Sequence, residues 1–222
     1  MTSFEINRTY IPENIRAVVF DFDNTLVDCI KPKVPQHRHT AKQLGIELSD
    51  EDILSNWSSH SFSGLLDKLY GAQSSLANQL IVEQYDQFPK EIYPDTIPTL
   101  RALGQSGLHL ALMTSLRIDR LEKDFEATGI EALLLEYIQT EKDTPVHKPN
   151  GAVFDPMKKW LHSVNVHDPE NALYIGDALE DMQAARAAKL GFVGIDRGFV
   201  TREQFENAGA LCVSSLAELV LR

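Results

Sequence analysis

The sequence contains few cysteines and no long apolar run. Cys29 and Cys212 are the only cysteines among 222 residues, and they form neither a Cys-x-x-Cys motif nor a Cys/His ligand spacing. They are therefore predicted to be free thiols in a reducing compartment, and nothing in the sequence requires a disulfide between them. No apolar stretch approaches the length of a membrane span, and the first residues lack the apolar segment of a signal peptide. We expect a soluble, cytoplasmic protein with no membrane partner.

Basic residues are also scarce relative to acidic ones. The chain has 21 Lys and Arg against 32 Asp and Glu, for a formal net charge of -11. Binding of duplex nucleic acid requires clustered Lys and Arg that displace counterions, so this balance argues against a nucleic-acid partner. Hydrophobic residues make up 43% of the chain, which is ordinary globular usage and predicts a buried core. The charge and composition do not determine the oligomeric state.

Short apolar runs alternate with stretches of helical periodicity. Each run is bounded by Gly, Pro, Asp or Ser, and the runs occupy residues 16–22, 108–115, 134–140, 171–177, 191–196 and 210–215. Several are apolar almost throughout, as expected of parallel strands covered on both faces. An alanine-rich helix before Gly191 is expected to end at that glycine. The pattern predicts an α/β fold with a doubly wound, Rossmann-like parallel sheet.

One interval, residues 31–90, lacks a convincing strand. Helical patterns fill it, and one of them opens with an S-x-x-D capping signal at Ser49 and Asp52. Pro32 and Pro35 precede these helices, and further prolines follow them, so we expect stiff hinges at both ends. The sequence thus predicts a core domain of residues 1–30 and 91–222 with an inserted α-helical cap domain of residues 31–90.

Four carboxylates are expected at one edge of the predicted sheet. Asp21 and Asp23 follow the first strand, and residues i and i+2 of a strand point to the same side. Asp177 and Asp181 follow another strand, and ligands of such sheets bind beyond the carboxyl ends of strands. Either motif taken alone is as readily a turn or helix cap. If the two strand ends converge, the crowded carboxylates require protonation or a hard cation, and oxygen ligands favour Mg²⁺ over Zn²⁺.

Two further groups suit the binding of a phosphate. Thr114 and Ser115 end an apolar strand and offer hydroxyl donors, and Lys148 precedes a helix and offers an ammonium group. Each taken alone has a plain structural reading, since Thr114 is also a candidate helix cap and Lys148 a candidate solvated surface lysine.

Four segments together resemble the motifs of one enzyme family. "DFDNTLVD", "LMTS", "HKPNG" and "IGDALED" occur in the order of the four motifs of the haloacid dehalogenase superfamily of hydrolases. The likeness covers nearly the whole chain, and the helical insert resembles the cap of the phosphoglycolate phosphatase-like branch. One departure is "KPNG", which replaces the commoner K-P-D-P run after the lysine.

The resemblance implies a phosphatase mechanism. Asp21 would be the nucleophile that forms an aspartyl-phosphate, and Asp23 would protonate the leaving alcohol and later deprotonate the attacking water. Thr114 and Ser115 would bind the phosphoryl group, and Lys148 would neutralise charge on the nucleophile and on the phosphate. Haloalkanoate dehalogenases of the superfamily lack an aspartate at the position of Asp23, because a halide leaving group needs no proton.

The resemblance also implies a cofactor and supporting residues. Mg²⁺ would be held by Asp21, the backbone carbonyl of Asp23 and Asp177, with Asp181 as a second ligand or an outer-shell partner. The backbone N–H groups of Asn24 and Thr25 would form an anion-binding nest. Asp28 is expected to support the turn into the helical insert and so to have a structural role.

The predicted function is a Mg²⁺-dependent phosphatase that hydrolyses a small phosphorylated metabolite. The alternative of the same architecture is a phosphomutase of the β-phosphoglucomutase type. An alternative of another class is a non-catalytic binding or regulatory module, which the intact set of motif residues disfavours. The basic segment 31–39 is a further candidate for drawing an anionic substrate toward the site, although such charge runs more often form a solvated face.

Overall fold

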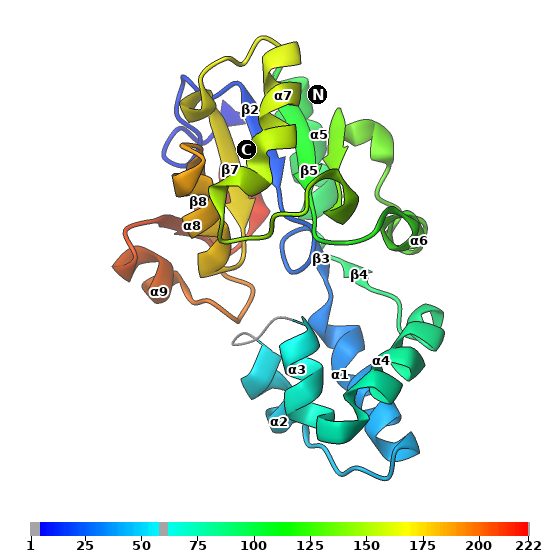
Figure 1. The fold of residues 1–222 in the computed structure, drawn as a ribbon. Coiled ribbons are helices and arrows are strands. Elements are labelled where there is room, and N and C mark those ends of the chain that lie inside the picture. Colours follow the sequence, from blue (N-terminus) through cyan, green and yellow to red (C-terminus); the bar gives the residue numbers. More distant parts are fainter. Residues whose placement is uncertain (1–4, 58–61, 222) are drawn as a thin grey trace. The chain divides into compact units, whose positions relative to one another are not determined.

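The computed structural model describes residues 5–57 and 62–221 (Figure 1). The chain divides into two compact units, one of which combines Met1–Val27 with Ile92–Arg222, while the other is Asp28–Glu91. The first unit is built around a parallel sheet, and the described part of the second unit is helical apart from its end strands. None of the described helices is both long enough and apolar enough to span a membrane.

The sheet of the first unit has six parallel strands. They are β2 (Ala17–Phe20), β5 (His109–Met113), β6 (Tyr137–Gln139), β7 (Ala172–Gly176), β8 (Gly191–Ile195) and β9 (Leu211–Val213). Their order across the sheet is β6-β5-β2-β7-β8-β9. The chain therefore builds one half of the sheet outward from β2, then crosses back and builds the other half from β7. This order confirms the predicted doubly wound fold, and it puts the switch point beside β2.

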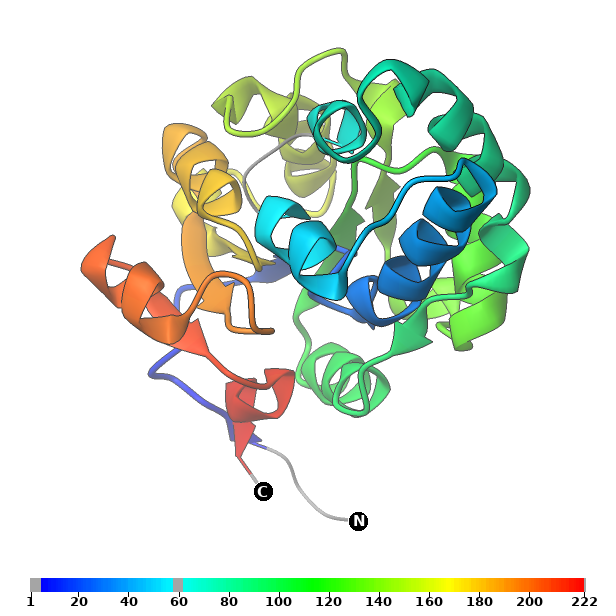
Figure 2. The ribbon, with the colours of Figure 1, turned by 90° about the horizontal axis from the view of Figure 1, so that it is seen from below.

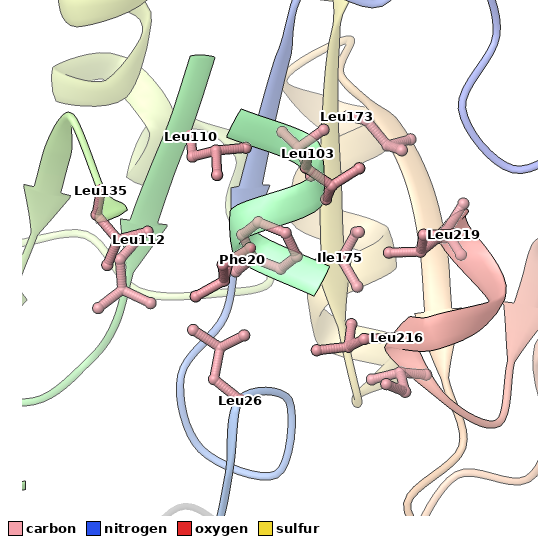
Figure 3. Close-up of a cluster of buried hydrophobic side chains, with 14 of the residues drawn as sticks. Phe20, Leu26, Leu103, Leu110, Leu112, Leu135, Leu173, Ile175, Leu216 and Leu219 are labelled. Atoms are coloured by element: carbon pink, nitrogen blue, oxygen red, sulfur yellow. The ribbon is translucent and has the colours of Figure 1, made fainter. Parts of the chain in front are cut away.

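Helices cover both faces of this sheet. They are α5 (Thr96–Gln105), α6 (Ile118–Thr128), α7 (Asp155–Ser163), α8 (Leu179–Ala187) and α9 (Arg202–Asn207). Val18 and Phe20 of β2 belong to one buried cluster, whereas Ala17 and Val19 belong to another, because successive side chains of a strand point to opposite faces. Figure 3 shows the first cluster, in which Leu103 of α5 lies with strand side chains on one face. Coverage of both faces explains why the strands are apolar almost throughout.

The segment before β2 packs against the C-terminal part of the first unit. Strand β1 (Glu5–Ile6) pairs antiparallel with β10 (Val220–Leu221), and Figure 2 shows the two strands in blue and red. The Asn7 side chain donates to the Glu218 carbonyl at 2.8 Å, and Ile11 is fully buried. The N-terminal lead is thus an integrated part of the described unit.

The described part of the second unit contains four α-helices with a hydrophobic core of their own. They are α1 (Ile30–Gln43), α2 (Asp50–Trp57), α3 (Phe62–Tyr70) and α4 (Ser74–Glu83). Ile53, Leu65, Leu69 and Ile81 are among the buried side chains that hold them together. The capping signal before α2 is confirmed, because Ser49 and Asp52 bond each other's backbone N–H groups. At the two ends of this unit, β3 (Val27–Asp28) and β4 (Glu91–Ile92) form a two-stranded sheet.

Two details differ from the expectations. Pro32 and Pro35 lie within α1 and not in a hinge before it, so the predicted proline hinge at this end is wrong. Pro32 lies in the first turn, where the missing N–H of proline has no helical partner in any case, whereas Pro35 lies inside the helix and removes one of its backbone hydrogen bonds. Gly191 does not cap α8, which ends at Ala187. The left-handed residue after that helix is Lys189, with φ of 66°.

The basic segment of α1 is largely paired or buried. Lys31 forms an exposed ion pair with Glu91, whereas Lys33 is buried and donates to Gln36 at 2.7 Å. His37 is fully buried. The segment is therefore neither an open basic patch nor a wholly solvated face.

Seven short 3₁₀ helices complete the described elements. They are η1 (Gly71–Gln73), η2 (Tyr85–Gln87), η3 (Ala132–Leu134), η4 (Glu141–Asp143), η5 (Gly151–Phe154), η6 (Pro169–Asn171) and η7 (Leu216–Leu219). Of these, η5 bears on the site described next.

Candidate active site

Two carboxylates follow neighbouring strands at the same edge of the sheet. β2 ends at Phe20, and the Asp21 N–H still donates to the Ile175 carbonyl of β7 at 2.8 Å. β7 ends at Gly176, so Asp177 emerges beside Asp21. β2 and β7 flank the switch point of the strand order, which is where open α/β sheets bind ligands.

A third carboxylate reaches this edge from α8. Asp181 is buried, and its Oδ2 accepts the Ala178 N–H at 3.0 Å and so caps the helix. Its Oδ1 lies 2.7 Å from the Lys148 Nζ. A Cβ on Gly176 would lie 2.6 Å from the Asp181 Cγ, so the glycine leaves the space that this carboxylate occupies. The Asp181 side chain thus both caps α8 and belongs to the site, two roles between which the sequence did not decide.

Asp21, Asp177 and Asp181 form an acidic triad. Each contributes a carboxylate oxygen, and these oxygens lie within 4.8 Å of one another. Burial raises the pKa of Asp21 to about 7, with Lys148 opposing the rise and Asp181 adding to it. Burial, followed by the charges of Asp181 and Asp21, raises the pKa of Asp177 well above its usual value. Such crowding favours either bound protons or a bound cation.

Lys148 supplies positive charge within the triad. Its Nζ lies 2.6 Å from the Asp21 Oδ1 and 2.7 Å from the Asp181 Oδ1. Burial lowers the pKa of Lys148, but the two carboxylates outweigh that effect and the net pKa is raised well above its usual value. The ammonium group is therefore charged at neutral pH and offsets part of the negative charge.

The loop that carries Lys148 is fixed by close packing against α8. A Cβ on Gly151, the first residue of η5, would lie 2.7 Å from the carbonyl carbon of Ala187. Only glycine allows η5 to approach the helix this closely. In addition, the buried Gln139 Nε2 donates to the Val153 carbonyl at 2.7 Å. These contacts fix the lysine loop relative to the helix of the third carboxylate.

Tyr174 belongs to the site and was missed by the sequence reasoning. Its hydroxyl lies 3.3 Å from the Asp21 Oδ1 and 3.4 Å from the Asp181 Oδ1, and the ring is fully buried. Tyr174 pairs with Val19 on β2, so their side chains lie on the same face of the sheet. Asp21 comes two residues after Val19 and therefore points to that face as well. A hydroxyl-bearing residue in an otherwise apolar strand was the signal available in the sequence.

The turn after Asp21 is closed by its own hydrogen bonds. Asn24 has φ of 53°, and its N–H donates to the Val27 carbonyl at 2.7 Å. The Thr25 N–H donates to the Phe22 carbonyl at 3.3 Å. The Asn24 side chain hydrogen-bonds to Asp177 and favours its charged form. Phosphate binding by the two amides stays a prediction, and it requires that they share or exchange these partners.

The remaining predicted site residues lie on nearby segments. Thr114 follows β5, which pairs with β2, and its Oγ1 accepts the Leu116 N–H at 3.1 Å. Ser115 is exposed. Asp23 is half-buried, and it bridges to Val27 across the turn. The roles of these residues in binding or catalysis stay predictions.

Asp28 has the expected structural role. Its Oδ1 accepts the backbone N–H groups of Ile30 and Lys31, each at 2.9 Å, and so caps the start of α1. This carboxylate is used by a helix terminus and belongs to no described acidic cluster.

The acidic triad fits a metal ion. Its donors are carboxylate oxygens, without imidazole or thiolate, and hard divalent cations prefer such ligands. A cation among the triad would also relieve the repulsion that raises the pKa values of Asp21 and Asp177.

Comparison with known proteins agrees with this geometry. The chain is 32% identical over 206 residues to the glyceraldehyde 3-phosphate phosphatase of Methanopyrus kandleri, covering 83% of this chain and 85% of that one. It is 26% identical over 210 residues to the phosphoglycolate phosphatase of Yersinia pseudotuberculosis, covering 90% and 88%. Its fold matches the crystal structure of a HAD family hydrolase from Deinococcus radiodurans with a TM-score of 0.76, at 20% identity and 93% coverage of each chain.

A family model also matches most of the chain. The model of haloacid dehalogenase-like hydrolases aligns with residues 18–195, a range that includes every residue of the acidic triad and Lys148. The resemblance carried by the four sequence motifs is thereby confirmed. The chain belongs to the haloacid dehalogenase-like hydrolases.

Proposed function

We propose that the chain is a Mg²⁺-dependent phosphatase that hydrolyses a small phosphorylated metabolite through an aspartyl-phosphate on Asp21. The observation that supports this most directly is the placement of Lys148 between Asp21 and Asp181, with Asp177 beside them. A nucleophile, a fixed cation and a cluster of metal ligands are the parts that phosphoryl transfer requires. The names of the two relatives, which specify a glyceraldehyde 3-phosphate phosphatase and a phosphoglycolate phosphatase, support small phosphorylated metabolites as the substrate class.

The first step transfers the phosphoryl group to the enzyme. An oxygen of the Asp21 carboxylate attacks phosphorus, and the bond from phosphorus to the alcohol oxygen breaks. Asp23, protonated at this stage, gives its proton to the leaving oxygen. The Lys148 ammonium group stabilises the negative oxygens of the phosphoryl group, and the Thr114 and Ser115 hydroxyls donate to them.

The second step releases phosphate. Water attacks phosphorus while the Asp23 carboxylate accepts a proton from it, and the bond from phosphorus to the Asp21 oxygen breaks. Both aspartates thereby return to their starting protonation states. Among the described residues, Tyr174 and Lys148 contact the same oxygen of Asp21, which supports attack by the other oxygen in the first step.

Mg²⁺ fits the oxygen ligands of the site. The ligands would be one carboxylate oxygen from each triad residue together with the backbone carbonyl of Asp23. When bound, it would supply positive charge for the transferring phosphoryl group.

The helical unit is proposed to be the cap that selects the substrate. Its predicted bounds, residues 31–90, lie within the compact unit Asp28–Glu91. The predicted cytoplasmic location is supported by the two cysteines, which are buried and not joined by a disulfide. Neither proposal changes the chemistry assigned to the core.

The proposed function is tested by phosphate release from small phosphoesters, including glyceraldehyde 3-phosphate and 2-phosphoglycolate. We expect release with Mg²⁺, loss of activity in excess EDTA, and a loss of at least about 1,000-fold in Asp21→Asn. The matched control is Asp168→Asn, an exposed carboxylate that caps η6 before β7, and it should retain activity. Full activity of the folded Asp21→Asn variant would refute the mechanism, as would undiminished activity in EDTA.

A further inference from the structure

The turn that follows the nucleophile is held from outside by three donors. Its own N–H groups bond within the turn, which leaves the carbonyls of Thr25 and Leu26 for other partners. The Leu26 carbonyl accepts the Thr96 hydroxyl at 2.7 Å and the Tyr93 N–H at 3.3 Å. The Thr25 carbonyl accepts the Arg197 guanidinium at 3.3 Å. Arg197 therefore contacts the catalytic turn although it lies in the loop after β8, far along the chain.

Arg197 is itself fixed on two sides. Its Nη2 lies 2.9 Å and 3.2 Å from the two carboxylate oxygens of Asp95. Its guanidinium carbon lies 3.8 Å from the centroid of the Tyr93 ring, which is a close cation–π contact. The Arg197 side chain is 9% exposed and that of Asp95 is 12% exposed. Little water competes with this pair, so its geometry is well defined.

Asp95 links the pair to a third segment of the chain. One of its oxygens accepts the Ser215 hydroxyl at 2.6 Å and the Leu216 N–H at 2.8 Å. Burial raises the pKa of Asp95. The hydrogen bonds from Arg197 and Ser215, together with the charge of Arg197 and the Leu216 N–H, lower it by more, so the net pKa is lowered. Asp95 is therefore a carboxylate anion that joins the starts of α5 and η7 to the loop after β8.

Stability alone is a poor explanation for this arrangement. A buried ion pair loses much of its attraction to desolvation, and apolar replacements are often equally stable. Within the described residues the buried Arg197 Nε has no hydrogen-bond partner, which costs stability further. The feature that the ion pair does provide is a fixed donor at the Thr25 carbonyl, two residues beyond the proposed acid/base Asp23.

We propose that Arg197, oriented by Asp95, is a positioning residue for the catalytic turn from Asp23 to Leu26. The inference rests on the proposed function, in which Asp23 transfers the proton and Asp21 attacks. Arg197 has no contact with these two carboxylates among the described interactions and acts through the Thr25 carbonyl. Misplacement of a catalytic group by about 1 Å can cost on the order of 100-fold in rate, so a modest release of the turn has a measurable effect.

The kinetic test compares Arg197→Gln, Asp95→Asn and the double variant with the wild type, using p-nitrophenyl phosphate and saturating Mg²⁺. We expect kcat to fall about 10-fold in each single variant while KM changes less than about twofold. The double variant should be no slower than the slower single variant, because both remove the same linkage. Unchanged kcat in folded Arg197→Gln, or a fall carried by KM alone, would overturn the proposal.

The matched control is Arg202→Gln. Arg202 also binds the C-terminal segment, through the Cys212 carbonyl at 2.5 Å and the Ser214 hydroxyl at 3.2 Å, and it has no described contact with the turn. Its loss should lower stability without changing kcat by more than about twofold. An equal fall of kcat in Arg202→Gln would show a general effect of destabilisation and would also overturn the proposal.

A second measurement separates this proposal from the proposed function. Amide hydrogen exchange of residues 24–27 should rise at least about 10-fold in Arg197→Gln and stay near wild type in Arg202→Gln. Absent phosphatase activity in the wild type would refute the proposed function, whereas the exchange result still tests the positioning role. Equal exchange of the turn in the wild type and Arg197→Gln would overturn that role whatever the activity.

Discussion

Acid is expected to destabilise the helical unit through one buried histidine. His37 is fully buried, its Nδ1 lies 2.8 Å from the Tyr70 hydroxyl, and that hydroxyl also bonds the His37 carbonyl at 3.1 Å. Among the described residues its Nε2 has no partner. Protonation therefore buries a charge and an N–H without an acceptor. Burial, with a smaller effect from Lys33, lowers the pKa of His37 from 6.5 to about 4.

The size and sign of the effect follow from this pKa. The folded state binds the proton less tightly than the unfolded state, so the contribution is fully present above pH 6.5 and is lost as pH falls toward 4. At about 1.4 kcal/mol per pKa unit, the full loss in the free energy of unfolding is about 3 kcal/mol, with about 2.5 kcal/mol of it by pH 4.5.

Trp57 gives a local readout of this loss. Its ring centroid lies 5.8 Å from that of His37, and Trp160 is the only other tryptophan, so Trp160→Phe makes the fluorescence specific to the helical unit. Urea unfolding of this background at pH 7.5 and 4.5 should show the loss, and His37→Gln should lack about 2.5 kcal/mol of it. The control is His39→Gln, since His39 is exposed. The reasoning is refuted if His37→Gln loses as much stability in acid as its parent, within about 1 kcal/mol.

Two further predictions concern the site. Gly151→Ala should lower activity at least about 10-fold and stability by about 1–3 kcal/mol, because its Cβ would overlap Ala187. The control Gly104→Ala, whose Cβ meets only the end of one side chain at 3.7 Å, should lower neither activity nor stability. Thermal unfolding and phosphate release check both variants, and a fully active Gly151→Ala would contradict the packing argument. Lys148→Met should bind Mg²⁺ more tightly in calorimetry, because the variant lacks the positive charge that competes with the metal ion for the triad. Its kcat should fall about 100-fold or more, because the same charge stabilises the phosphoryl group. Weaker Mg²⁺ binding in this variant would contradict the electrostatic account.

The local parts of the site were predictable because their signals are local. The placement of Asp21 and Asp177 after two strands was predicted from the periodicity of each segment alone. Their proximity followed from the rule that ligands bind where the carboxyl ends of parallel strands meet. The fold class followed from the same alternation. Asp181 was predicted as a site carboxylate with a turn or helix cap as the alternative, and only the structure shows that the one side chain serves both uses.

Other parts depend on contacts between distant segments. Nothing near Arg197 indicates that it meets Asp95, and nothing near Gly151 indicates a helix against its Cα. Gly191 was assigned to a helix end because glycine favours left-handed backbone there. Its lack of a side chain instead serves β8, where a Cβ would lie 3.1 Å from the Leu173 side chain. Such choices reflect tertiary packing, which the local pattern does not contain.

The antiparallel pair of β1 and β10 shows that the site does not depend on the order of its residues along the chain. Glu5 pairs with Leu221, so the two described ends of the chain meet at one point of the first unit. A short linker could join them, and new ends could be opened in an exposed turn, as circular permutation requires. In such a permutant the carboxylate of Asp181 could precede that of Asp21 along the polypeptide without moving either strand. The order of the motifs along the sequence is thus not required by the chemistry, whereas the adjacency of β2 and β7 in the sheet is required.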